Sequence, residues 1–237
     1  FRKILYLCKA SAKLIKFAVL QKKILRNLLM TSNQRIKTII FDFGGVIINL
    51  DLPKCIQNFK NLGVHNVETY LSNFGQSGFF LQWEKGEIGI PEFRNEIRKI
   101  AEFPLSDEQI DQAWCSFLTD IPAHRIELLK KLRQQYRLLL LSNSNPLHID
   151  VSAAGEFKKY GAHIYDFFDN CYFSYKIGMT KPDEEIFQYV MKDAGVIPEE
   201  CLFIDDGKKN IETAVRMGFR THLMKQGDNL DFLLSLS

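Results

Sequence analysis

Residues 38–47, TIIFDFGGVI, constrain the fold more than any other stretch of this chain. An apolar run of β-branched and aromatic residues ends at Asp42, and two glycines follow almost at once. Such a run is typical of a strand buried on both faces of a parallel sheet, and glycines let the chain turn sharply there. Because ligands of open α/β sheets bind at the carboxyl ends of the strands, we expect Asp42 at that edge. It would serve there as a nucleophile or a metal ligand, or simply end the strand in solvent.

The same pattern recurs along the chain, in alternation with helical segments. Further strands are expected at 137–141, 171–175, 201–204 and 219–224. Helices are expected after Pro122, before Gly195 and before Gly218, because apolar residues recur there on one helical face and glycine commonly ends a helix. Alternating strands and helices predict an α/β fold with a doubly wound parallel sheet.

Residues 52–120 differ in character from the rest. Phe93, Ile97 and Ile100 recur at helical spacing, and strand-like runs are few. We therefore predict an inserted helical cap over 52–120, between the two parts of a core formed by 36–51 and 121–237.

The first 35 residues form a predicted basic extension. Residues 1–30 hold eight Lys and Arg and no acid, so the remainder carries 23 basic against 28 acidic side chains. That balance gives no reason to expect nucleic-acid binding. Lysines interrupt every apolar run of the extension, which excludes stable membrane insertion. The extension has three readings: a start placed too far upstream, an appended helix, or a membrane or targeting segment.

The five cysteines are odd in number and scattered, and no CxxC occurs. This usage predicts reduced thiols in a cytoplasmic protein. The sequence does not define the oligomeric state, with a monomer slightly favoured.

Polar side chains end the predicted strands. Asp42, the pair Ser142-Asn143 and the pair Asp205-Asp206 each close a strand, and Lys181 lies in a loop between the last two. Carboxylates brought together repel unless a cation separates them, and oxygen ligands without His or Cys suit Mg²⁺. Lysine, hydroxyl and amide donors would hold phosphate oxygens. Attack on phosphorus by Asp42, the remaining nucleophile, would give an aspartyl-phosphate that water hydrolyses.

These residues resemble the haloacid dehalogenase-like hydrolases, most of which are phosphatases. The resemblance covers about residues 36–225 and rests on four motifs in order: FDFGGVI with Asp42, LLLSNSN with Ser142, the pair Lys181-Pro182, and FIDDGKKN with Asp205 and Asp206. The segment WEKGEI at 83–88 and the sequence SNSNPLH resemble the subgroup of glucose-1-phosphate phosphatases and the amino-terminal phosphatase domain of soluble epoxide hydrolase.

The resemblance implies a role for each motif residue. Asp42 is the nucleophile and a magnesium ligand, the backbone carbonyl of Gly44 is a second ligand, and Asp206 is a third. Asp205 binds the metal directly or through water, and Asn210 orients the acidic pair.

The same resemblance supplies the phosphate-binding residues. Ser142 and Asn143 bind the phosphate. Lys181 anchors both the phosphate and the nucleophile, which makes it a catalytic residue beside Asp42.

Gly44 departs from the family pattern. Most phosphatases of the family carry an Asp two residues after the nucleophile as general acid and base, which typically supplies 10²–10⁴-fold in rate. Asp51 or Glu84 would have to replace it, although each is expected to be a solvated surface acid, or the substrate has a good leaving group, as an anomeric sugar phosphate does. His148, which follows the polar cluster of the second strand, is expected to be a surface hydrogen-bonding residue, and a catalytic role is its second reading. Otherwise the protein binds without turnover.

The sequence therefore predicts a Mg²⁺-dependent phosphatase acting on a small phosphomonoester, with a sugar phosphate as the favoured substrate class. The alternatives are a 2-haloacid dehalogenase, against which the acidic pair argues, and a non-catalytic phosphate-binding protein. In the cap, Trp83 and the pair Phe79-Phe80 are expected to pack with one another, and lining the substrate pocket is the second reading.

Overall fold

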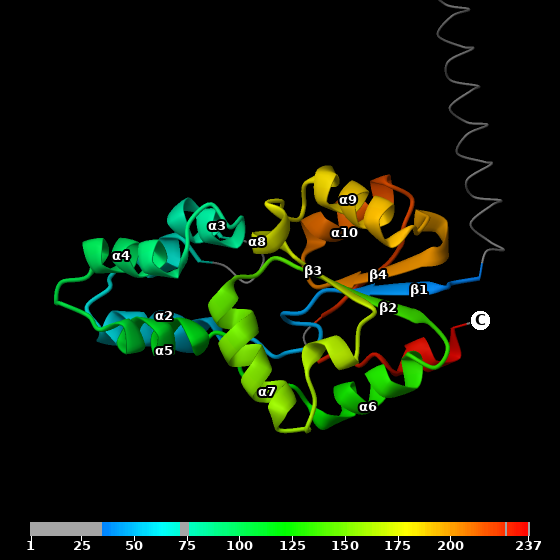
Figure 1. The fold of residues 1–237 in the computed structure, drawn as a ribbon, viewed down its shortest axis with the longest axis horizontal. Coiled ribbons are helices and arrows are strands. Elements are labelled where there is room, and N and C mark those ends of the chain that lie inside the picture. The colour runs from blue at the N-terminus through cyan, green and yellow to red at the C-terminus, as the bar shows by residue number, and fades with distance from the viewer. Residues whose placement is uncertain (1–34, 72–75, 226, 237) are drawn as a thin grey trace, which may run out of the picture. The chain divides into compact units, whose positions relative to one another are not determined.

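A five-stranded parallel sheet forms the centre of the structure (Figure 1). The computed structural model describes residues 35–71, 76–225 and 227–236. Its strands are β1 (Thr38–Phe41), β2 (Arg137–Ser142), β3 (Asn170–Phe173), β4 (Cys201–Asp205) and β5 (Arg220–Leu223). They lie in the order β3-β2-β1-β4-β5, so both neighbours of the central strand are far from it in the sequence. Apart from Arg35, the predicted basic extension lies outside the described residues. The three readings of the extension therefore stay predictions.

Helices cover both faces of the sheet. They are α6 (Ala123–Leu132), α7 (Ala154–Lys158), α8 (Ser174–Ile177), α9 (Glu184–Ala194) and α10 (Lys208–Arg216). The short helical turns are η1 (Val67–Thr69), η2 (His148–Ala153), η3 (Ile164–Asp166), η4 (Pro198–Glu200) and η5 (Asp231–Ser235). In β1, Ile39 and Phe41 pack with α6 and α7, whereas Ile40 packs with α9 and α10. This alternation confirms the doubly wound α/β fold.

The third strand is shorter than predicted. It ends at Phe173, and Ser174 and Tyr175, predicted as strand, begin α8. The hydroxyl of the buried Ser174 accepts a hydrogen bond from the Ser144 amide at 2.9 Å. This hydrogen bond joins the residues that follow β2 and β3, and a hydropathy pattern cannot predict it.

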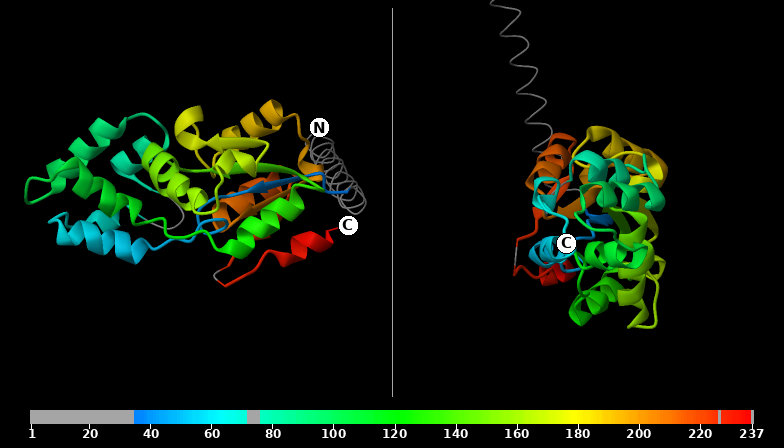
Figure 2. Two further views of the ribbon diagram at one scale, coloured as in Figure 1. Left: turned by 60° about the horizontal axis from the view of Figure 1, so that its bottom comes forward. Right: turned by 90° about the vertical axis from the view of Figure 1, so that its left-hand side faces the viewer.

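The insert after β1 is helical, as expected. It comprises α2 (Leu52–Asn61), α3 (Gly78–Glu84), α4 (Ile90–Ile100) and α5 (Asp107–Cys115), which lie beyond one end of the sheet in Figure 2. These helices share a hydrophobic cluster of their own, in which the rings of Trp83 and Phe93 stack with centroids 3.5 Å apart. Phe80 is buried in the same cluster, so it and Trp83 pack within the cap. The limits 52–120 of the cap stay a prediction.

The cap contacts the core on two sides. On one side, the indole Nε1 of Trp114 in α5 donates to Oδ1 of Asn145 at 3.2 Å. The Trp114 ring also stacks on His148 with centroids 4.4 Å apart. On the other side, Gly86 approaches the backbone of Tyr175 so closely that a Cβ would lie 2.2 Å from its carbonyl oxygen.

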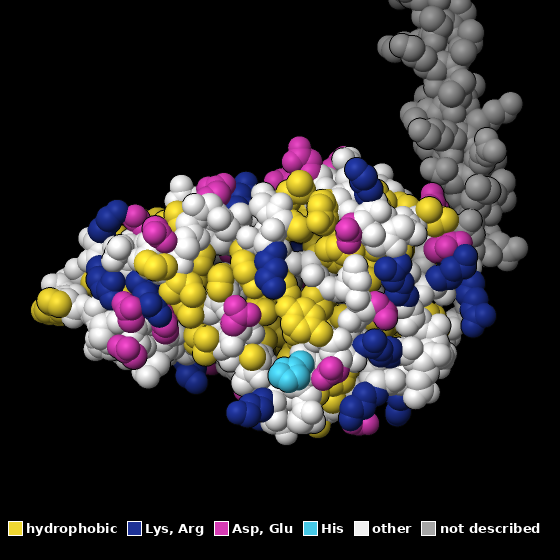
Figure 3. Space-filling view, viewed as in Figure 1, with side chains coloured by type: hydrophobic (Ala, Val, Ile, Leu, Met, Phe, Trp, Pro, Cys, Tyr) yellow, Lys and Arg dark blue, Asp and Glu magenta, His cyan; other side chains and the backbone are white. Residues whose placement is uncertain are grey.

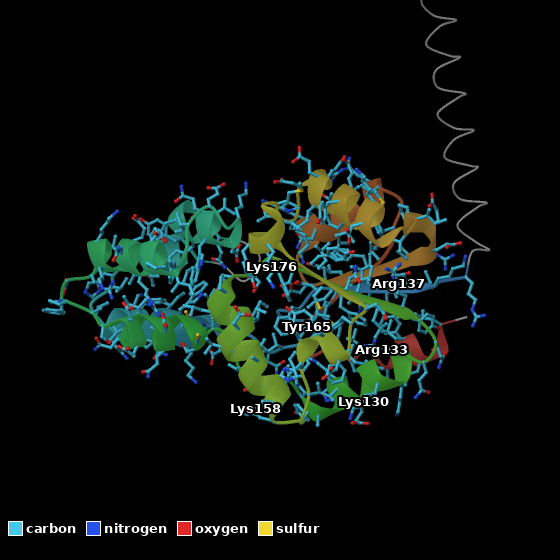
Figure 4. The ribbon with its side chains drawn as sticks, viewed as in Figure 1. Lys130, Arg133, Arg137, Lys158, Tyr165 and Lys176 are labelled. Carbon is cyan, nitrogen blue, oxygen red and sulfur yellow. The ribbon has the colours of Figure 1, made fainter. Side chains whose placement is uncertain are left out.

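Helix α8, which carries Tyr175, makes further contacts within the core. Lys176 of α8 places its Nζ 5.2 Å from the Phe173 ring centroid and 5.6 Å from that of Tyr175, within cation–π range. The same Nζ lies 3.5 Å from the hydroxyl of Tyr165, and Figure 4 shows both side chains on this face. Acidic and basic side chains are interspersed over the face that Figure 3 shows. Among the described residues, no helix has both the length and the apolar character needed to cross a membrane.

Candidate active site

Asp42 stands at the carboxyl end of the central strand. The register pairs Phe41 of β1 with Ile204 of β4, so the next residues along, Asp42 and Asp205, lie side by side. The amide of Asp42 donates to the carbonyl of Ile204 at 2.8 Å, which extends the ladder by one residue. Strand pairing therefore brings together two carboxylates that are more than 160 residues apart in the sequence.

The glycine turn after Asp42 makes room for Asp206. Gly45 has a φ of +72°, in the left-handed region that glycine tolerates. A Cβ on Gly45 would lie 2.3 Å from Oδ2 of Asp206, so the missing side chain is also a steric requirement. One ligand atom from each of Asp42, Asp205 and Asp206 lies within 4.8 Å of the others.

Lys181 lies between two of the three acids. Its buried Nζ is 2.8 Å from Oδ1 of Asp42 and 2.6 Å from Oδ2 of Asp205. Burial by itself would lower the pKa of Lys181, but these two carboxylates raise it above the usual range. Lys181 is therefore a fixed cation that holds Asp42 in place.

Asp205 is fully buried and already satisfied at both oxygens. Its Oδ1 accepts the amide of Gly207 at 2.7 Å and Nδ2 of Asn210 at 2.9 Å, while Oδ2 accepts Lys181. Asn210 therefore contacts Asp205, one member of the acidic pair that it is predicted to orient. Asp205 is thus built into the scaffold of the site more firmly than Asp206.

Burial and charge repulsion both act on the carboxyls of Asp42 and Asp206. Burial is the largest cause that raises the pKa of Asp206, and the neighbouring Asp42 and Asp205 raise it further. For Asp42, burial also raises the pKa above its usual value, with Lys181 opposing and Asp205 reinforcing the shift. Two carboxyls that resist ionising side by side favour a cation between them.

Ser142 is the last residue of β2, Asn143 follows it, and both face the same space. Both line the cavity that Asp42 and Lys181 line. The Asn143 amide, however, bonds to the main chain of Lys181: its Oδ1 accepts the Lys181 amide at 2.8 Å, and its Nδ2 donates to the Lys181 carbonyl at 2.9 Å. The sequence predicted phosphate binding by this side chain and missed its use as a clamp on Lys181. Nδ2 carries two N–H groups, and the hydrogen bond to the Lys181 carbonyl uses one of them.

The cavity is small, about 60 Å³, and the cap supplies part of its wall. Residues of the core are joined there by Gln76 and Glu84 of the cap, and by the apolar side chains of Leu50, Phe117 and Leu118. Neither Gln76 nor the apolar wall was predicted, because no motif marks them. A wider hollow adjoins the cavity and shares Asp206 and Asn210 with it, and its wall includes the exposed Lys208, Lys209 and Lys225.

The two candidate proton donors, Asp51 and Glu84, fall in different places, and His148, expected at the surface, is buried. Asp51 caps α2, where its Oδ1 accepts the amide of Lys54 at 2.9 Å. His148 lines the cavity, but its ring is stacked on Trp114, and burial lowers its pKa to about 4. Glu84, expected as a solvated surface acid, is instead buried in the cavity wall.

The fold and this edge of the sheet define a doubly wound α/β protein with a cluster of three acids beside a helical insert. A model of the haloacid dehalogenase-like hydrolase family matches residues 36–218. The chain therefore belongs to the haloacid dehalogenase-like hydrolases.

Relatives at substantial identity point the same way. D-ribitol-5-phosphate phosphatase of Bacteroides thetaiotaomicron is 38% identical over 192 residues, which are 81% of this chain and 93% of that protein. The crystal structure of a HAD family enzyme from the same organism, in complex with magnesium and inorganic phosphate, is similar with a TM-score of 0.78 and 43% identity. That match covers 84% of this chain and 98% of that chain. A predicted HAD-like hydrolase of Porphyromonas gingivalis has a TM-score of 0.76 at 40% identity, covering 82% and 93% of the two chains.

Proposed function

We propose that this protein is a Mg²⁺-dependent phosphatase that hydrolyses a small phosphomonoester through an aspartyl-phosphate on Asp42. The single observation that carries the proposal is the position of the Asp42 carboxylate. Its Oδ1 is held 2.8 Å from the Nζ of Lys181, in a cavity whose wall also contains Asp206 and Ser142. A carboxylate fixed by a cation beside phosphate-binding donors is suited to attack phosphorus.

The acidic cluster fits a magnesium ion. Its candidate donors are all oxygens: the carboxylates of Asp42 and Asp206, the backbone carbonyl of Gly44 and, directly or through water, Asp205. Burial, and then repulsion from neighbouring acids, raises the pKa values of Asp42 and Asp206, and a divalent cation would offset both effects. A bound magnesium ion would neutralise charge on the transferring phosphoryl group. The relative crystallised with magnesium and inorganic phosphate supports this choice.

The chain's own residues divide the remaining work. An oxygen of Asp42 attacks phosphorus while Lys181 and the Ser142 hydroxyl hold the other phosphate oxygens. The second N–H of the Asn143 amide is placed to act as a further donor, and the two hydrogen bonds from Asn143 to the Lys181 main chain keep that cation in place. The cap covers the cavity and excludes bulk water, which strengthens each of these contacts.

For the substrate we propose a sugar or polyol phosphate. The relative at 38% identity is named for D-ribitol 5-phosphate, an ester of a primary alcohol. Such an ester has a poor leaving group, so this class requires a proton donor despite Gly44. Anomeric sugar phosphates, favoured by the resemblance to glucose-1-phosphate phosphatases, form the second class.

A 2-haloacid dehalogenase and a non-catalytic binding protein are less well supported. The L-2-haloacid dehalogenase RSc1362 shares the fold, with a TM-score of 0.53 at 17% identity. Its likeness concerns the fold alone, whereas the acidic cluster of this chain fits a metal-dependent reaction. We further propose a cytoplasmic location, supported by the free thiols of the four described cysteines, and a monomer that acts on small molecules alone.

The direct test is an assay of the purified protein with and without Mg²⁺, on sugar phosphates, polyol phosphates and p-nitrophenyl phosphate. We expect Mg²⁺-dependent phosphate release that disappears in Asp42→Asn. Release of halide from 2-haloacids would identify a dehalogenase instead. Bound phosphate without release from any ester would favour the binding protein.

A further inference from the structure

We propose that Glu84, the last residue of α3 in the cap, is the catalytic acid that protonates the leaving-group oxygen and the base that then activates water. The inference rests on the proposed phosphatase function and supplies the proton donor that Gly44 cannot. The family pattern places the general acid in the core, two residues after the nucleophile, whereas this proposal assigns that role to a residue of the cap.

The position of Glu84 is the first argument. Its side chain is 6% exposed and lines the cavity with Asp42, Lys181 and Ser142. Within the described part of the chain, its Oε2 has no hydrogen-bond partner, although a hydrogen bond from Gln76 reaches the carboxyl group. A buried carboxyl oxygen without a partner costs stability. In a cavity wall, that oxygen is available to a ligand.

The cap is held so that Glu84 stays over the core site. Gly86, two residues on, has a φ of +69° and packs directly on the carbonyl of Tyr175, where any side chain would collide. This contact joins the turn after α3 to α8 of the core. Glu84 is therefore fixed from both sides, by helix α3 before it and by the close approach of Gly86 after it.

The charge environment suits an acid. The charged groups that act on Glu84 are Lys181 and Asp42 of the core, and the other titratable groups in the cavity wall are Asp206 and His148. Burial raises the pKa of Glu84 to about 8, with Lys181 opposing the shift and Asp42 reinforcing it. Glu84 thus carries its proton near neutral pH, as a general acid must.

The other groups of the cavity wall are less suited. The His148 ring is neutral and stacked on Trp114, and its Nε2 lies 3.3 Å from the Trp114 carbonyl. Asp42 is the nucleophile, and Asp206 is assigned to the metal. Asp51 is committed to its helix cap and is not part of this wall.

The two half-reactions balance in protons. Asp42 forms a bond to phosphorus, the bond from phosphorus to the ester oxygen breaks, and that oxygen takes its electron pair together with the proton of Glu84. The alcohol leaves and Glu84 is a carboxylate. A water molecule then gives a proton to Glu84 and attacks phosphorus, which breaks the bond to Asp42 and releases phosphate.

The test compares Glu84→Gln with wild type on two esters: the alkyl phosphate that wild type hydrolyses best and p-nitrophenyl phosphate. Because kcat/KM reports the steps up to release of the alcohol, we expect it to fall about 10²–10⁴-fold for the alkyl ester. For the aryl ester, whose leaving group needs no proton, kcat/KM should change little. Hydrolysis of the phosphoenzyme should slow with both esters, so the aryl ester should show a burst of p-nitrophenol.

Controls separate the possible outcomes. Glu87→Gln removes an exposed acid three residues away and should match wild type. Retention of inorganic phosphate binding by Glu84→Gln checks that the site is folded. An equal fall of kcat/KM for both esters, or no fall for either, would overturn the role of Glu84. Absence of turnover by wild type itself would instead overturn the proposed function.

Discussion

The side-chain amide of Asn143 makes two hydrogen bonds to the main chain of Lys181. Oδ1 accepts from the Lys181 amide nitrogen at 2.8 Å, and Nδ2 donates to the Lys181 carbonyl oxygen at 2.9 Å. This pair of hydrogen bonds joins the end of β2 to the loop that carries the lysine. The Nζ of Lys181 in turn lies between Asp42 and Asp205. The clamp therefore controls where the cation stands relative to the nucleophile.

Asn143→Ala should lower kcat about 10²-fold, because small misplacements of a catalytic group have effects of that size. Two neutral hydrogen bonds are lost, so the free energy of unfolding should fall by about 2 kcal/mol. Steady-state kinetics and urea unfolding measure the two effects. Asn61→Ala, which removes an exposed asparagine bonded to Gln57, is the control. An unchanged kcat in Asn143→Ala would show that Lys181 is held well enough by its carboxylate partners alone.

Gly45→Ala should weaken the metal site. The new Cβ would stand 2.3 Å from Oδ2 of Asp206, so that carboxylate must move. We expect at least a 10-fold lower affinity for Mg²⁺, in line with changes in the support of metal ligands, measured by calorimetry or by Mg²⁺ titration of activity.

Gly178→Ala is the matched control for this change. Gly178 has a φ of +73°, close to the +72° of Gly45, but nothing within 4 Å of its would-be Cβ. It carries the same backbone strain without the collision. Equal Mg²⁺ affinities in the two variants would show that the contact with Asp206 does not matter.

Binding of Mg²⁺ should release protons. The pKa values of Asp42 and Asp206 lie above the usual range, first because both carboxyls are buried and then because acids of the cluster repel one another. A cation favours the ionised forms, so apparent affinity should rise with pH from mildly acidic to neutral values. Calorimetry in two buffers of different ionisation enthalpy measures the protons released. Asp206→Asn should release fewer, and heats independent of the buffer would contradict the prediction.

Without metal, Glu84→Gln should be more stable than wild type, and the difference should grow as pH rises. Burial raises the pKa of Glu84 from 4.5 to about 8, so the folded state holds this proton more tightly than the unfolded state. The stability linked to that proton is complete below pH 4.5 and is lost as pH rises through 8. Since one pKa unit corresponds to about 1.4 kcal/mol, the variant should gain a few kcal/mol over wild type across this range.

Urea unfolding of wild type and Glu84→Gln in EDTA, at pH 5 and at pH 8.5, measures this gain. Glu87→Gln should show none. A difference between Glu84→Gln and wild type that does not change with pH would mean that Glu84 is already ionised at neutral pH. That result would also count against its role as the acid.

The local pattern of apolar and polar residues was sufficient to predict the strands of the core. Apolar runs closed by Asp42, Ser142 and Asp205 predicted three strands of a parallel sheet with functional groups at their carboxyl ends. The structure shows that these three strands are neighbours. The error at 171–175 arose where a tertiary hydrogen bond between Ser144 and Ser174 outweighs β propensity. Helical spacing likewise predicted the insert, although it could not show how its helices pack.

The sequence by itself determined which residues stand at the edge of the sheet, since strand alternation and the glycine turn after Asp42 are encoded locally. Only the tertiary structure decided what those residues face. The clamp of Asn143 on Lys181, the close approach of Gly45 to Asp206 and the burial of Glu84 all join segments far apart in the chain. Such contacts depend on how the cap and strands pack in three dimensions, and a one-dimensional pattern carries no record of that packing.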